Sequence, residues 1–174
     1  AYGDVTITFK GLGVQRIVSG ESIVEAVLSG QYSTGDYDVL VIELAVEQLI
    51  NEGLLSGNYI VGGRTENLVV ALTGKRYIKI NQETINYANL ANVFNSGVAV
   101  VTVGVYSDDT SSRTTQELYT VDGKSVQLPC WHAYGVVGMT ETTITIVNPW
   151  NSKEQYTFWI QDVLQFGKNF EIKV

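Results

Sequence analysis

Two strand-like segments separated by a short turn constrain the fold of this chain more than any other feature. Residues 133–139 and 142–147 are rich in apolar and β-branched side chains, and the dipeptide at residues 140–141 stands between them. This arrangement is typical of a β-hairpin, whose two outer ends lie side by side. His132, the only histidine of the chain, and Asn148 flank the two segments. The sequence therefore predicts that these two side chains meet at one end of adjacent strands.

A histidine beside an asparagine is suited to general base catalysis. The amide oxygen of Asn148 would accept the proton on one ring nitrogen of His132, which leaves the other nitrogen facing a nucleophile. Pro149 fixes the backbone where the chain leaves the strand, and Trp150 would lie over the hydrogen bond and exclude water from it. The alternatives are a structural histidine that is bonded within the fold, and a turn that carries a packed aromatic ring.

The rest of the chain predicts helices in its first part and mostly strands in its second. We expect strands over residues 4–9, 14–18, 98–105, 117–121, 155–160 and 170–173, and helices over residues 38–52, 65–71 and 83–94, with one helical turn within 158–166. Asp36 or Asp38 can cap the start of the first helix, and Gly53 can end it. Because no repeat, low-complexity tract or linker is visible, we expect one α+β domain over residues 1–174.

Composition excludes several classes of function. The net charge of −7 and the pI of about 4.6 argue against nucleic-acid binding, which needs a basic surface. The longest apolar run, residues 68–72, is too short for a membrane span of about 20 residues. The single cysteine, Cys130, excludes an internal disulfide and a cysteine-rich zinc site. A start at Ala1, with many Tyr, Thr, Asn and Gly and few Lys and Arg, favours a processed chain that is secreted or lies on the surface of a bacterium.

The sequence also resembles the calpain family of papain-like cysteine peptidases. His132-Ala133-Tyr134 followed by Asn148-Pro149-Trp150 is similar to the family segment that carries the catalytic base. The similarity extends in patches through residues 37–173, at residues 40–45, 57–59, 62–63, 72–74, 83–94, 158–160 and 166. The resemblance implies the second half of a papain-like fold, a twisted antiparallel sheet or barrel flanked by helices that presents the base to a cleft.

The same resemblance implies a cysteine endopeptidase. His132 would take the proton of a thiol and return it to the leaving amine, Asn148 would orient the ring, and Trp150 would support the pair. The upstream segment with the nucleophilic cysteine and the oxyanion-hole glutamine has no match here. We therefore expect the His/Asn heavy chain of a heterodimer, whose separate or cleaved light chain supplies the cysteine, acting on polypeptides. Candidate residues of the substrate cleft are Gly62, Gly63 and Trp131.

Two features near these motifs have two interpretations each, and one residue departs from the family pattern. Cys130 and His132 could share a strand face, but Cys130 follows proline with no helix behind it, so a buried structural thiol is favoured over a nucleophile. No cofactor is certain; calcium is implied only by the resemblance, and Asp108-Asp109 is either a contact to it or a solvated turn. Asn151 stands where the family has glycine, a substitution that is tolerable if Asn151 takes a left-handed conformation.

A non-catalytic binding or adhesion module is the alternative function. Such a module would keep the peptidase-like fold without the nucleophile. Aromatic residues among polar positions on predicted strands could then line a sugar-binding face, although tyrosine also fills half-exposed sheet surfaces without any such role.

Overall fold

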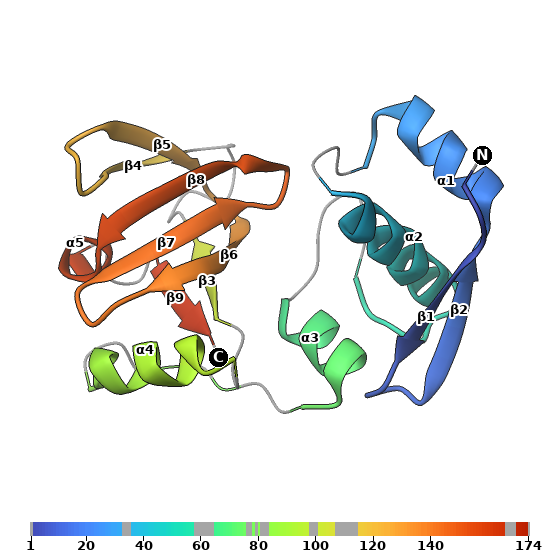
Figure 1. The fold of residues 1–174 in the computed structure, drawn as a ribbon, viewed down its shortest axis with the longest axis horizontal. Helices are drawn as coiled ribbons and strands as arrows, with labels where there is room; N and C mark the ends of the chain where they lie inside the picture. The colour runs from blue at the N-terminus through green and yellow to red at the C-terminus, as the bar shows by residue number, and fades with distance from the viewer. Residues whose placement is uncertain are drawn as a thin grey trace. The chain divides into compact units, whose positions relative to one another are not determined.

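The chain divides into two compact units, Ala1–Tyr77 and Ile78–Val174. The structure, a computed structural model, describes residues 2–32, 36–57, 65–75, 78, 80, 84–97, 101–106, 115–165 and 170–173. Each unit combines helices with antiparallel strands around a hydrophobic core of its own (Figure 1). The predicted α+β class is therefore confirmed. The prediction of one domain over residues 1–174 stays a prediction.

The first unit is a hairpin packed against helices. Its elements are β1 (Val5–Phe9), β2 (Val14–Val18), α1 (Gly20–Ser29), α2 (Tyr37–Asn51) and α3 (Thr65–Thr73). The strands are antiparallel, α2 packs against both of them, and α1 packs against α2 (Figure 1). Along each strand alternate side chains turn inward, so that Phe9 and Val18 are fully buried in the core of this unit. The hairpin predicted over residues 4–9 and 14–18 is confirmed.

Local capping explains where the first two helices begin. The Ser19 side chain accepts the Ser22 N–H at 3.1 Å, and the Asp36 side chain accepts the Asp38 N–H at 3.0 Å. These bonds satisfy N–H groups that a helix start leaves without a partner in the helix. Of the two predicted caps for α2, Asp36 is therefore the correct one, and Gly53 follows the helix with a positive φ of 72°. Helix α1 was not predicted, although Ser19 was a signal for its start.

The second unit contains a five-stranded antiparallel sheet in the order β8-β7-β6-β3-β9. Its elements are α4 (Tyr87–Asn95), β3 (Thr102–Val105), β4 (Thr115–Tyr119), β5 (Ser125–Pro129), β6 (His132–Met139), β7 (Thr143–Asn148), β8 (Asn151–Trp159), α5 (Ile160–Gln165) and β9 (Phe170–Lys173). Helix α4 packs against β6, and α5 contacts β8 and β4. Strands β4 and β5 form a separate hairpin (Figure 1).

The register of β6 and β7 determines the position of the predicted motif. Gly135 pairs with Val147 and Met139 with Ile144, with a bulge between these two pairs. The turn closes where the Thr140 N–H donates to the Thr143 carbonyl oxygen at 2.9 Å, as predicted for residues 140–141. Inward side chains of these strands form the core, with Ile144 exposed by only 1% of its surface. The hairpin predicted from the sequence is confirmed.

Several element boundaries differ from the predicted ones. Helix α4 begins at Tyr87 rather than at residue 83, because the Asn86 side chain accepts the Asn89 N–H at 3.0 Å and caps it there. Strand β8 begins at Asn151, earlier than predicted, because β7 turns back at once through residues 149–150. Strand β5 was not predicted.

Candidate active site

His132 and Asn148 lie together at one end of the central hairpin. His132 is the first residue of β6 and Asn148 the last residue of β7. The ring nitrogen Nε2 of His132 is 3.0 Å from Oδ1 of Asn148. The predicted approach of these two side chains is therefore confirmed, whereas their catalytic role stays a prediction.

The partners of Asn148 determine which way its amide group points. Its Oδ1 accepts the backbone N–H of Trp150 at 3.1 Å, and its Nδ2 donates to Oε2 of Glu154 at 3.0 Å. A backbone N–H can only donate and a carboxylate can only accept, so the amide oxygen must face the N–H of Trp150 and the amide nitrogen must face Glu154. Asn148 is itself buried, which makes an unsatisfied amide costly and reinforces this orientation.

The orientation of this amide in turn determines the tautomer of His132. Because Oδ1 of Asn148 is an acceptor, the facing nitrogen Nε2 must carry the hydrogen. In the neutral ring the other nitrogen, Nδ1, then holds a lone pair. His132 makes no further hydrogen bond among the described residues, so Nδ1 can accept a proton from a group placed beside it.

Aromatic rings enclose part of the imidazole. The ring of Trp150 lies 3.9 Å from that of His132, measured between centroids, at an interplanar angle of 34°. The ring of Tyr134 meets it edge-on at 4.8 Å. His132 is half-buried, while Trp150 keeps 62% of its surface exposed. Trp150 thus takes the predicted position against the pair, and its outer face stays in contact with solvent.

This enclosure affects the basicity of the imidazole. Burial lowers the pKa of His132 below its ordinary value, and the hydrogen bond to Asn148 opposes that change by raising the pKa. At neutral pH the ring is therefore uncharged and able to take a proton, which is the state that a general base needs. Burial is also the main reason why the pKa of the Tyr134 hydroxyl is raised, so that this tyrosine remains a neutral hydrogen-bond donor.

The backbone at Trp131 separates Cys130 from His132. Trp131 has a φ of 56°, the only positive φ at a non-glycine residue in the part of the chain that the structure describes. Since β6 starts after it, the alternation that would place Cys130 on the face of His132 does not apply. Cys130 is instead part of the hydrophobic core, as the structural interpretation predicted. The side chain of Trp131 is half exposed and meets Tyr106 edge-on at 5.6 Å.

Asn151 does not adopt a left-handed conformation. It begins β8 with an ordinary negative φ, and its side chain explains why no glycine is needed there. Its Nδ2 donates to Oε1 of Glu154 at 3.1 Å, and its Oδ1 accepts the Lys153 N–H at 3.2 Å. A left-handed conformation is therefore not needed at this position, because these bonds hold the turn in an extended backbone.

Glu154 is the residue of this site that the sequence did not reveal. Its two carboxylate oxygens bind the amide groups of Asn148 and Asn151. The available signal was the pairing of the two strands: Val147 pairs with Gln155 and, after a shift in register, Asn148 pairs with Asn151, so that Glu154 lies between the two pairs on the neighbouring strand. That signal requires the register of β7 and β8, which the sequence pattern alone did not supply.

Two further predictions, for the substrate cleft and for calcium, fall on residues that the structure does not describe. Gly62, Gly63 and the pair Asp108-Asp109 lie outside the described residues. Within the described ranges, no three His, Cys, Asp or Glu side chains gather in a way that could hold a metal ion. No helix in those ranges is long and apolar enough to cross a membrane.

No family model, curated protein or solved structure matches the chain. Its function is therefore inferred from the arrangement of His132, Asn148 and Glu154.

Proposed function

We propose that this chain is the base-bearing part of a calpain-like cysteine endopeptidase with a papain-like fold. The observation that carries the proposal is the hydrogen bond between Nε2 of His132 and Oδ1 of Asn148, in a network that leaves Nδ1 unprotonated. A cysteine peptidase needs a neutral imidazole whose free nitrogen faces the thiol and whose other nitrogen is held by a neutral acceptor. The motifs that resemble the calpain family support the same assignment.

The proposed reaction runs through the two ring nitrogens of His132. Nδ1 takes the proton of a cysteine thiol, and the thiolate attacks the carbonyl carbon of a peptide bond to form a tetrahedral intermediate. The imidazolium then gives the Nδ1 proton to the leaving amine as the C–N bond breaks, which leaves a thioester. Water attacks the thioester with His132 again as the base, and the acid product and the thiol are released. Throughout, Oδ1 of Asn148 accepts the Nε2–H bond and stabilises the charged ring.

The nucleophile in this proposal comes from outside residues 1–174. Cys130 is the only cysteine of the chain and is buried in the core, with 9% of its surface exposed. A light chain, or further sequence of the same polypeptide, would place a cysteine beside Nδ1 of His132. We also propose polypeptides as the substrate and the surface or surroundings of a bacterium as the location, on the basis of the resemblance and of composition.

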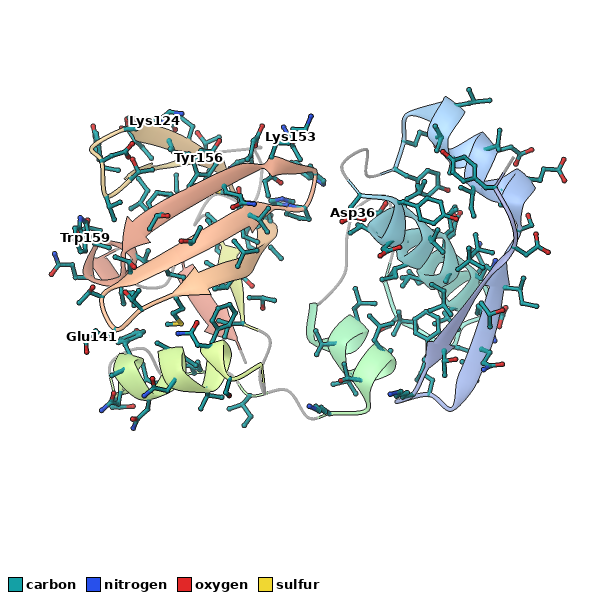
Figure 2. The ribbon with its side chains drawn as sticks, viewed as in Figure 1. Asp36, Lys124, Glu141, Lys153, Tyr156 and Trp159 are labelled. Atoms are coloured by element: carbon teal, nitrogen blue, oxygen red, sulfur yellow. The ribbon has the colours of Figure 1, made fainter. Side chains whose placement is uncertain are left out.

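The test is to purify the protein natively and to treat it with a cysteine-directed peptidyl inhibitor. We expect a co-purifying chain or segment to be labelled, peptide cleavage to occur, and His132→Ala to abolish both. Glu141→Gln is the control, because Glu141 is exposed in the β6–β7 turn, whereas His132 and Asn148 lie at the opposite end of this hairpin. In Figure 2 Glu141 lies far from Lys153, which is near the start of β8 and so marks the end of the sheet that carries the site. Cleavage that survives in His132→Ala would contradict the proposal, as would a chain that is alone, monodisperse and unlabelled.

A non-catalytic binding module is the second candidate, and one observation favours it. Trp131, which precedes His132 in the sequence, exposes 53% of its surface. Trp150, whose ring lies against that of His132, exposes 62%. Exposed tryptophans of this kind are common contact residues in binding surfaces. This candidate predicts that peptides bind to the purified chain, that they are not cleaved, and that Trp150→Ala weakens the binding.

A further inference from the structure

A carboxylate outside the His/Asn pair is bonded to Asn148. Glu154 is half-buried on β8, and its Oε2 accepts Nδ2 of Asn148 at 3.0 Å. Its Oε1 accepts Nδ2 of Asn151 at 3.1 Å, so both oxygens are engaged. Asn151 is in turn held through its Oδ1 by the Lys153 N–H. The carboxylate is therefore fixed from a second side and cannot turn away from Asn148 without losing a bond.

The consequence of this contact lies at His132. A side-chain amide can rotate by half a turn, which exchanges its oxygen and nitrogen at almost no steric cost. Were the amide of Asn148 to rotate, its NH₂ group would face Nε2 of His132. That nitrogen would then need a lone pair, and the ring hydrogen would move to Nδ1. The rotated state is disfavoured because its oxygen would face the carboxylate of Glu154 and its nitrogen the N–H of Trp150.

We propose that Glu154 is a positioning residue that orients the amide of Asn148 and thereby keeps Nδ1 of His132 free of hydrogen. The effect on the tautomer stands on the hydrogen bonds alone. Its consequence for catalysis rests on the proposed function, because only a general base at Nδ1 requires that lone pair. Glu154 acts through Asn148 and does not touch His132, so its contribution is to the orientation and basicity of the ring.

Two contributions of Glu154 can be separated by substitution. As an acceptor, it orients the amide; as a negative charge, it stabilises the imidazolium through the polarised amide. The charge acts on its surroundings, since Glu154 contributes to the raised pKa of the Tyr134 and Tyr156 hydroxyls. Glu154→Gln keeps an oxygen that can accept from Asn148 and removes the charge. Glu154→Ala removes both.

The test uses the fact that His132 is the only histidine. In uniformly ¹⁵N-labelled protein near neutral pH, its two ring nitrogens give the only imidazole signals, and their chemical shifts report which nitrogen carries the hydrogen. We expect Nε2 in the protonated range and Nδ1 in the unprotonated range for the unmodified chain. In Glu154→Ala we expect both shifts to move toward each other as the Nδ1–H tautomer becomes populated and the protected Nε2–H signal is lost. Glu154→Gln should restore the original pattern, and Glu141→Ala should leave it unchanged.

Activity of the complete enzyme gives the second readout. We expect Glu154→Ala to lower kcat/KM by about 10- to 100-fold, by analogy with other residues that hold a catalytic group in place, with the loss mainly in kcat. Glu154→Gln should recover most of this loss. If Glu154→Ala does not fold, Glu154→Met, which has a similar length and no oxygen, takes its place in both measurements.

The outcomes separate the two claims. If the ring nitrogens of the Ala or Met variant keep the original shifts, the positioning role is wrong whatever the enzyme does. If the shifts change as expected but no cysteine-bearing partner restores cleavage to the unmodified chain, the positioning role stands and the peptidase function is wrong. If Glu154→Gln shows the same altered shifts as Glu154→Ala, the negative charge of Glu154 is what determines the tautomer of His132. The proposal that a side-chain oxygen at this position orients the amide of Asn148 is then overturned.

Discussion

Nε2 of His132 and Oδ1 of Asn148 are 3.0 Å apart at the open end of the β6–β7 hairpin, and this bond joins the first residue of one strand to the last residue of the other. It lies just beyond the backbone ladder, where Gly135 pairs with Val147. The buried side chains of the two strands determine this register, so the position of the bond is set by the core of the unit. The properties of His132 can therefore be tested in the isolated chain, before any partner is known.

The first prediction concerns the titration of His132. Its pKa is lowered mainly by burial, so its NMR titration midpoint should lie below 6.5, the ordinary value for histidine. Between the lowered pKa and 6.5 the unfolded chain binds more protons than the folded chain. The contribution of His132 to stability is therefore fully present above pH 6.5 and is lost as the pH falls through this window. Urea unfolding at several pH values checks the sign, and His132→Ala should remove this component. A midpoint at or above 6.5 would contradict the prediction.

Asn148→Ala should lower the titration midpoint of His132 further. The substitution removes the hydrogen bond that raises the pKa and leaves the effect of burial in place. It also leaves the Trp150 N–H and the Glu154 carboxylate without their shared partner, so we expect a loss of about 1–3 kcal/mol in the free energy of unfolding. The titration and a urea unfolding curve measure the two effects separately. A midpoint that rises would show that the bond does not favour the charged ring.

Trp150→Ala should move the same midpoint in the opposite direction. The Trp150 ring lies 3.9 Å from that of His132 and contributes to its burial. Without this ring, water reaches the imidazole and the pKa returns toward 6.5. Trp159→Ala is the matched control, because Trp159 ends β8, whereas Trp150 directly precedes the start of this strand. Figure 2 shows Trp159 and Lys153 at opposite ends of β8. Equal shifts in the two variants would count against a local effect.

Phe158 and Trp159 are adjacent on β8 but should differ in their effect on stability. Phe158 is exposed by 1% and belongs to the core of the second unit, whereas Trp159 is exposed by 40%. We expect Phe158→Ala to cost about 3–5 kcal/mol because it leaves a cavity. Trp159→Ala should cost less than about 1 kcal/mol, the scale of a cross-strand contact. Chemical unfolding measures both values, and similar losses would mean that the faces of β8 are assigned wrongly.

Gly11→Ala should destabilise the first unit. A Cβ atom at Gly11 would lie 1.9 Å from the carbonyl oxygen of Val70 in α3, and the Gly11 N–H donates to the carbonyl oxygen of Ala71 at 2.9 Å. Both neighbours are backbone atoms, so the turn between β1 and β2 must move away from α3. We expect a loss of at least about 1–3 kcal/mol. Gly3→Ala is the control, because nothing lies within 4 Å of a Cβ atom there. Equal thermal unfolding of the two variants would contradict the contact.

Local patterns in the sequence predicted the elements that carry the site. The apolar and β-branched runs on each side of residues 140–141 predicted the β6–β7 hairpin, and its flanking residues predicted the bond between His132 and Asn148. This was possible because strand alternation and turn residues act between near neighbours in the chain. Helix α2 was predicted within one residue at each end because helix periodicity and caps are also local, and Asp36 is one of the two caps that the sequence offered.

Only the tertiary structure decided how the site is completed. Sequence alternation left open whether Cys130 shares a strand face with His132; in the structure the backbone at Trp131 turns with a positive φ and Cys130 lies in the core. The contact of Glu154 with Asn148 depends on the register of β7 and β8, which shifts at the end of β7. Register is chosen by the packing of all the strands together, and a change of one residue would exchange the faces of a strand. The sequence by itself thus determined which two residues meet, and the packed sheet determined which nitrogen of His132 carries the hydrogen.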